Sequence, residues 1–339
     1  MVMPTPLIED PLATPAYVGS LALPLRVLWS DVRGPGLGPS DIAYNCDLRQ
    51  YGPRPNMLKM IEGNPFAAHL GAADLLPGAL KRAWPELHRR IASAHEDGVA
   101  LYDSQKVICT AAYELGPHRL GLDLARASYL GRLIVVNDPE GLATLRSASN
   151  GVPSTMALPV LGIAVCLFTG DRRLILTRRS RSVAAASGAR SISASGGVSA
   201  SGFGANRPYL HQTAVRELGQ EIWSTLGERV NIEDVRVRAL FVNTDNLQVG
   251  AIAEVVTRLE STEIMAGRGE DAYEVDEREA VRADDNVAGL IARLVSERAD
   301  WEPMSLFGVL LCLGSRHSPE QVEELVAGAL KAHPYEPQS

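Results

Sequence analysis

Two glutamates four residues apart are the clearest candidates for chemistry in this chain. Residues 214–222 read Ala-Val-Arg-Glu-Leu-Gly-Gln-Glu-Ile. On a helix, Glu217 and Glu221 share one face, with Gln220 beside them. Four apolar residues fall on the opposite face at the spacing of a buried stripe: Val215, Leu218, Ile222 and Leu226. Such a helix can bind a hard divalent cation, which takes oxygen ligands and keeps several waters. The alternative is an ordinary solvated helix face.

A glycine pair, Gly196 and Gly197, lies upstream of these carboxylates. The pair and the helical segment together resemble the signature of the Nudix hydrolases. That signature is a glycine, a glutamate six residues on, and then Arg-Glu-apolar-x-Glu-Glu-x-Gly on a helix. Residues 216–222 match the helical half, and the glycine pair is similar to the glycine start. The resemblance extends over roughly residues 155–260.

The chain departs from the signature at several positions. No acidic residue lies between Gly197 and Arg216, so the family's early glutamate is missing. Gln220 replaces the first glutamate of the Glu-Glu pair, and Trp223 occupies the place of the late glycine. These departures are similar to those of divergent Nudix members, such as the animal enzymes that hydrolyse UDP-glucose and UDP-galactose. Those enzymes also have an extra N-terminal domain.

The segments around the motif predict a mixed sheet. Alternating and apolar runs bounded by turn residues are typical of strands. They occur at residues 161–168, 173–178, 191–195, 235–242 and 250–257. With the helix in the middle, this order is the one that the Nudix resemblance implies, an α/β (α+β) fold built as an α/β/α sandwich. Any mixed sheet with one crossover helix would show the same order.

The length of 339 residues predicts two domains, a small α+β unit over residues 1–150 and a Nudix-like domain over 151–335. One large domain is the alternative. In the first we expect a short strand near 25–29, a helix over 76–97, strands at 100–102, 107–110 and 120–124, and a short helix from Asp138. In the second we expect an exposed acidic loop over 261–289, then helices over 285–298 and 318–332.

Positive charge is concentrated ahead of the helix. Residues 172–216 contain eight arginines and no acidic residue. Guanidinium groups bind phosphate oxygens two at a time, so this stretch is a candidate anion site. Alternatively, its arginines are surface residues that pair with the acidic stretch near residue 270. The resemblance implies substrate contacts for one set of residues: Arg178, Arg179, Arg181, Gly196 and Gly197.

The resemblance also implies the metal ligands, which are Glu217 and Glu221, with Gln220 offering a neutral amide oxygen. Glu254 is the one acidic residue in the strand 250–257 and resembles the glutamate that many family members supply from outside the motif. Catalytic roles are therefore implied for Glu217, Glu221 and Glu254. Glu254 is otherwise an outward-facing strand residue. His211 is either a local base or a helix residue without a chemical role.

The implied activity is pyrophosphohydrolysis. The enzyme would cleave the diphosphate linkage of a nucleoside diphosphate joined to another group, using Mg²⁺ or Mn²⁺. Nucleotide sugars and dinucleotides of the ADP-ribose or NAD type are the implied substrates. The alternative is a catalytically inactive Nudix-like domain that binds nucleotides or regulates. The missing early glutamate and Gln220 favour this alternative.

Bulk composition narrows the class of protein. At 46% hydrophobic and 22% charged residues, the chain is typical of a soluble globular protein. A net charge of −7 argues against general nucleic-acid binding. The four cysteines are widely spread, and no apolar run reaches the roughly 20 residues that a membrane span needs. We therefore expect a cytoplasmic protein that binds no membrane. The sequence leaves the oligomeric state open, and a homodimer is compatible with it.

Overall fold

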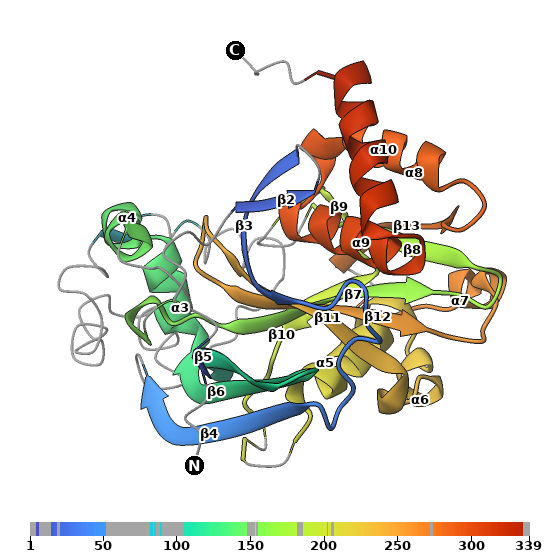
Figure 1. Cartoon of the computed structure of the whole chain (residues 1–339). Coiled ribbons are helices and arrows are strands. Elements are labelled where there is room, and N and C mark those ends of the chain that lie inside the picture. The colour runs from blue at the N-terminus through green and yellow to red at the C-terminus, as the bar shows by residue number, and fades with distance from the viewer. Residues whose placement is uncertain are drawn as a thin grey trace.

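Two β-sheets form the framework of the protein, as Figure 1 shows for the computed structural model of the chain. The structure describes residues 5–6, 15–18, 21–51, 82–83, 85, 89, 105–147, 153, 155–181, 186–201, 203–204, 207–271 and 274–334. Within this part of the chain, the larger sheet has nine strands and the smaller sheet has four.

The larger sheet follows the order β13-β8-β7-β12-β11-β3-β2, with β10 paired to β7 and β9 paired to β8. Its strands are β2 (Pro15–Val18), β3 (Leu21–Ser30), β7 (Leu161–Phe168), β8 (Arg173–Arg179), β9 (Arg190–Ser191), β10 (Ala194–Gly197), β11 (Val235–Asn243), β12 (Val249–Val256) and β13 (Val275–Arg282). The central pair, β7 and β12, is parallel, and the other pairs are antiparallel. All of β7 is buried, which explains its unbroken apolar sequence.

Helices cover both faces of the larger sheet, so the fold is an α/β/α sandwich (Figure 1). On one face lie α5 (Tyr209–Glu217), a π-helical turn (Leu218–Ile222) and α6 (Leu226–Arg229). On the other lie α8 (Val287–Ser296), α9 (Pro303–Arg316) and α10 (Pro319–Ala332). Side chains alternate along a strand, so each face has its own apolar cluster. Val165 packs in the cluster of the α5 face, and Cys166 packs in the cluster of the α9 face.

The smaller sheet adjoins the α5 face. Its strand order is β1-β5-β6-β4, and it is followed by two helices. The elements are β1 (Thr5–Pro6), β4 (Ile42–Tyr51), β5 (Gln105–Gly116), β6 (Arg119–Ser128), α3 (Tyr129–Val136) and α4 (Pro139–Ser147). Ile108 and Leu122 belong to the same buried cluster as the α5 face, and the N–H of Cys109 donates to the carbonyl of Pro159 at 3.0 Å. The two sheets therefore share one core.

The fold class expected from the sequence is confirmed. The expected strands correspond to β7, β8, β11 and β12, and the run 191–195 is divided between β9 and β10. The expected helices at 285–298 and 318–332 correspond to α8 and α10. Ser318 begins α10, because its hydroxyl accepts a hydrogen bond from the N–H of Gln321. Most of the expected helix over 76–97 and the strand at 100–102 lie outside the described residues.

Two expectations differ from the structure. Residues 261–289 are not one exposed loop, because they include α7 (Ser261–Ala266) and the edge strand β13. Arg178 on β8 lies opposite Glu277 on β13, and the two side chains form an ion pair. This cross-strand charge pair helps to stabilise a strand that shows little apolar alternation. In addition, β2 and β3 precede residue 150 but lie in the larger sheet, so a domain boundary at residue 150 does not fit these two strands. For the elements from β4 to α4, the division into two domains remains a proposal.

No helix in the described part of the chain is long and apolar enough to span a bilayer.

Candidate functional site

The helical segment positions Glu217 and Glu221 at the edge of the larger sheet. Helix α5 ends at Glu217 and continues into the π-helical turn, where the N–H of Trp223 donates to the carbonyl of Leu218 at 3.1 Å. Leu218, Ile222 and Leu226 are fully buried. The apolar stripe predicted from the sequence therefore exists and holds the segment against the sheet. Single π-helical turns inside helices often occur at functional sites.

Both carboxylates are buried, and this corrects the view of a solvated helix face. Glu217 is 7% exposed and Glu221 is 5% exposed. They face β10, the strand with the glycine pair. A Cβ on Gly196 would lie 2.2 Å from the Glu217 carboxyl carbon, so a larger residue there would displace this carboxylate. The backbone N–H of Ser195 donates to Glu221 Oε2 at 3.2 Å. The glycine strand and the carboxylates thus form one packed unit.

Two arginines bring positive charge to this unit. Arg216 forms an ion pair with Glu217, and its Nη2 donates to the carbonyl of Gly197 at 2.9 Å. Arg179 Nη1 donates to the Ser195 hydroxyl at 3.1 Å. The positive charge of Arg179 favours the ionised form of Glu221. Of the arginine-rich stretch, Arg179 and Arg216 are therefore the members whose described contacts lie at the carboxylate pair.

Burial shifts the pKa values of both glutamates upward. Desolvation raises the pKa of Glu217 above its ordinary value, and the positive charge of Arg216 opposes this rise. Desolvation raises the pKa of Glu221 well above 4.5, and the negative charge of Glu217 adds to the effect. The carboxylate of Glu274 raises both values further. Like charges held in a desolvated site are typical of functional carboxylates, although structural ion pairs also shift pKa values.

Glu274 is the acidic residue that the sequence analysis did not single out. It lies just before β13, and the N–H of Ser180 donates to its backbone carbonyl at 2.8 Å. That contact brings residue 274 to the end of β8, the strand that also holds Arg179. In the sequence it is one acidic residue among many in the 270s. No spacing rule could select it, because its position depends on strand pairing.

Two polar atoms of the site have no hydrogen-bond partner among the described residues: Glu221 Oε1 and Arg216 Nε. A buried oxygen left without a partner costs stability, and a bound cation would satisfy it. Mg²⁺ is commonly held by one or two carboxylates together with waters and substrate phosphates. Glu217 and Glu221 fit that pattern. Within the described residues, no three His, Cys, Asp or Glu side chains gather closely enough to hold a metal ion alone.

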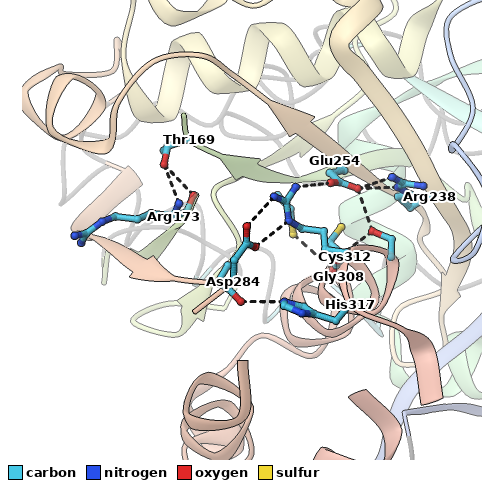
Figure 2. Close-up of polar contacts among 12 residues, drawn as sticks. Thr169, Arg173, Arg238, Glu254, Asp284, Gly308, Cys312 and His317 are labelled. Carbon is cyan, nitrogen blue, oxygen red and sulfur yellow. Dashed lines mark hydrogen bonds and ion pairs between the residues drawn. The ribbon is translucent and has the colours of Figure 1, made fainter. Parts of the chain in front are cut away.

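Glu254 lies on the other face of the larger sheet, away from Glu217 and Glu221. Figure 2 shows its carboxylate between Arg238 and the end of α9. Arg238 Nε donates to Glu254 Oε2 at 2.8 Å, and Arg316 Nη1 lies 3.3 Å from Oε1. Arg316 also contacts Asp284 at 3.4 Å. The structure therefore places Glu254 in a buried ion-pair network and does not bring it to the candidate site.

The other residues predicted from the sequence have contacts of different kinds. Arg178 contacts Glu277 at 3.4 Å and donates to the carbonyl of Gly188 at 2.7 Å, which supports the alternative of pairing with the acidic stretch. Arg181 is exposed, and no described contact joins it to the carboxylates. Gln220 is half-buried, and its backbone oxygen accepts a hydrogen bond from the N–H of Asp271. The His211 ring is buried 3.0 Å from the Leu37 carbonyl, as a helix residue without a chemical role would be.

We expect Glu221→Gln to raise the melting temperature of the ligand-free protein at pH 8 but to change it little at pH 4.5. Because folding raises the pKa of Glu221 above 4.5, its contribution to stability is fully present below that value. The contribution is lost as the pH rises through the raised pKa. Glutamine cannot ionise, yet it can accept the Ser195 hydrogen bond. Thermal unfolding at several pH values measures the difference.

The matched control is Glu228→Gln, which alters an exposed glutamate of α6. Its melting temperature should follow the wild-type curve at every pH. If the melting temperature of Glu221→Gln also follows the wild-type curve, ionisation of the Glu221 carboxylate does not destabilise the folded protein.

No family model matches the chain, and no curated protein matches it. A Nudix hydrolase from Alicyclobacillus acidocaldarius is similar at 13% identity over 48% of this chain and 95% of its own, with a TM-score of 0.34. A Deinococcus radiodurans protein is similar at 17% identity over 45% of this chain and 82% of its own, with a TM-score of 0.32.

A bifunctional NMN adenylyltransferase/ADP ribose pyrophosphatase from Francisella tularensis is also similar. Its identity is 10% over 47% of this chain and 42% of its own, with a TM-score of 0.29. Nudix hydrolases occur among the structural matches.

Proposed function

We propose that this protein is a divergent Nudix-type hydrolase. It cleaves the diphosphate linkage of a nucleoside diphosphate joined to another group, such as a nucleotide sugar or a dinucleotide of the ADP-ribose type. The observation that carries the proposal is the buried pair Glu217 and Glu221 against the glycine strand, with one carboxylate oxygen that no described residue contacts by a hydrogen bond.

Glu217 and Glu221 would hold a divalent cation, Mg²⁺ or Mn²⁺. When bound, such a cation offsets the charge that builds on phosphoryl oxygens and lowers the pKa of a coordinated water. Glu274 adds negative charge near the pair and so strengthens its attraction for a cation. Burial of the glutamates strengthens each of these electrostatic interactions, because the local dielectric is low.

The arginines supply the charge that a diphosphate needs. Arg179 lies beside Ser195, and Arg216 lies beside Gly197, so both guanidinium groups border the glycine strand. Planar guanidinium groups bind and orient phosphate oxygens. We assign to these two residues the binding and orientation of the diphosphate. Arg178 is not included, because it pairs with Glu277.

The alternative function is a nucleotide-binding or regulatory domain without catalysis. One observation favours this alternative: the positive charge of Arg216 already neutralises the Glu217 carboxylate, because the two side chains form an ion pair. Gln220 and the missing early glutamate agree with this alternative. Nucleotide binding that needs no metal would distinguish it from the hydrolase.

Calorimetry tests the two functions directly. Mg²⁺ is titrated into the protein with and without adenosine 5′-(α,β-methylene)diphosphate, a diphosphate that cannot be hydrolysed at its bridge. The hydrolase predicts that metal and nucleotide strengthen each other's binding. Nucleotide affinity that is equal with and without Mg²⁺ supports the binding domain, and no affinity for either probe rejects both functions.

We expect Arg179→Ala to weaken binding of the same methylene diphosphate about tenfold, which corresponds to about 1.4 kcal/mol. The substitution removes a charged donor at the Ser195 end of the glycine strand. Arg178→Ala is the matched control, because it removes an arginine one residue away whose described partners are Glu277 and Gly188. Calorimetric affinities should separate the two variants. Equal losses in both would mean that general charge, and not position, attracts the ligand.

A further inference from the structure

We propose that Lys106, a residue of the smaller sheet, belongs to the phosphate-binding site and donates an N–H of its ammonium group to an oxygen of the bound diphosphate. The inference rests on the proposed function and names a binding residue outside the segment that resembles the Nudix signature. It also gives the smaller sheet a direct role in ligand binding.

Backbone pairing brings Lys106 to the glycine strand. The N–H of Val107 donates to the carbonyl of Val198 at 3.0 Å, and the N–H of Ala200 donates to the carbonyl of Gln105 at 3.2 Å. Lys106 itself forms an isolated bridge with Ser199. Strand β5 therefore lies against the segment that directly follows Gly196 and Gly197. Backbone hydrogen bonds on both sides of Lys106 set the strand register, and this register fixes the position of the Lys106 Cα atom beside the glycine strand.

The side chain of Lys106 extends over Gly197. A Cβ on Gly197 would lie 3.8 Å from Lys106 Nζ. The ammonium also lies 5.5 Å from the centre of the Tyr129 ring, within the range of a cation–π contact. The carbonyl of Gly197, in turn, accepts the hydrogen bond from Arg216. Lys106 and Arg216 thus approach the same glycine.

The ammonium has unused donor capacity. A lysine has three N–H donors, and none of the described residues accepts a hydrogen bond from Nζ or forms an ion pair with it within 4.0 Å. Glu217 and Glu274 attract the ammonium over longer distances, and Arg216 repels it. A half-buried cation without an acceptor is available to a ligand that supplies oxygen atoms, and a diphosphate supplies several.

The same surroundings explain how a diphosphate would be held. Burial, and to a smaller extent the charge of Arg216, lower the pKa of Lys106 below its ordinary 10.5, so its positive charge is costly where no oxygen atom accepts from it. A phosphate oxygen beside Nζ would remove that cost. Lys106, Arg179 and Arg216 would then surround the glycine strand with three cations from different parts of the sequence.

The test compares three variants by calorimetry with adenosine 5′-(α,β-methylene)diphosphate at a fixed Mg²⁺ concentration. Lys106→Met keeps the length of the side chain and removes its charge, and we expect affinity to fall at least about tenfold. Lys106→Arg keeps a charge and should bind within a few-fold of wild type. Lys331→Met is the matched control, because Lys331 is exposed near the end of α10 in the helical layer on the other face of the larger sheet.

A pH profile separates ligand contact from a structural role. Because the ammonium must be protonated to bind phosphate, wild-type affinity should fall as the pH rises through the lowered pKa of Lys106, in a window below 10.5. A guanidinium group stays charged there, so Lys106→Arg should lack this fall. This comparison remains valid if Lys106→Met does not fold.

The outcomes distinguish this inference from the proposed function. Wild-type affinity in Lys106→Met, or the same alkaline fall in Lys106→Arg as in wild type, would overturn the assignment of Lys106 alone. Failure of the wild-type protein to bind the methylene diphosphate would overturn both. Tenfold weaker binding in Lys106→Met with an unchanged melting temperature would support the assignment.

Discussion

Glu217→Gln and Glu221→Gln should each lower kcat by at least about 100-fold while the protein remains folded. Each substitution keeps the size of the side chain but removes one of the two carboxylates proposed to hold the cation. Because both side chains face the same strand, losing either should be nearly as damaging as losing both. Turnover of UDP-glucose and ADP-ribose is measured as phosphate that an added phosphatase releases from the products.

Two further variants are compared with Glu217→Gln and Glu221→Gln: one is a control, and the other adds a carboxylate. Glu228→Gln alters an exposed glutamate in α6 and should leave kcat unchanged. Gln220→Glu restores a charge that the Nudix signature has, and it should strengthen Mg²⁺ binding. A wild-type protein that binds no divalent metal, together with a Gln220→Glu variant that does, would indicate a site that has lost its catalytic function.

Glu254→Ala should destabilise the protein by about 3–5 kcal/mol, a loss typical of breaking a buried ion pair. The Glu254 side chain is 5% exposed, and it contacts Arg238 and Arg316. Removing it leaves Arg238 without its carboxylate and Arg316 with Asp284 as its remaining one. Arg316 also lies 4.2 Å from the centre of the Phe168 ring. Urea unfolding measures the change in the free energy of unfolding.

Glu320→Ala provides the contrast. Glu320 pairs with Arg33, but both side chains are largely exposed, so its loss should have little effect on unfolding. The kcat of folded Glu254→Ala should stay close to wild type under native conditions. A variant that keeps its stability but loses turnover would return Glu254 to the catalytic role that the family resemblance implies.

Local patterns predicted much of the fold. The apolar run of β7 could be recognised because a strand covered on both faces needs apolar residues throughout. The stripe Leu218, Ile222 and Leu226 likewise indicated which side of the helical segment is buried. β13 could not be recognised in this way, because the strand that pairs with it is β8, about a hundred residues earlier.

The candidate site was less predictable. Spacing placed Glu217 and Glu221 on one face, but their burial depends on the close approach of Gly196. Alternation along β8 puts neighbouring arginines on opposite faces, so Arg178 and Arg179 have different partners. Alternation along β12 likewise directs Glu254 to the other face of the larger sheet, away from the site. Lys106 is brought to Gly197 by pairing between distant segments, and no local pattern reports such pairing.

The position of β3 has a consequence for the order in which the protein can assemble. β3 lies between β2 and β11 in the larger sheet, and Leu25 is opposite Asn243. During synthesis, β3 leaves the ribosome long before its partner β11 exists. Until then one edge of β3 has no strand beside it, and unpaired edges favour association between nascent chains. Products that terminate before residue 235 would keep that edge open, so premature termination should yield aggregates and not a folded N-terminal fragment.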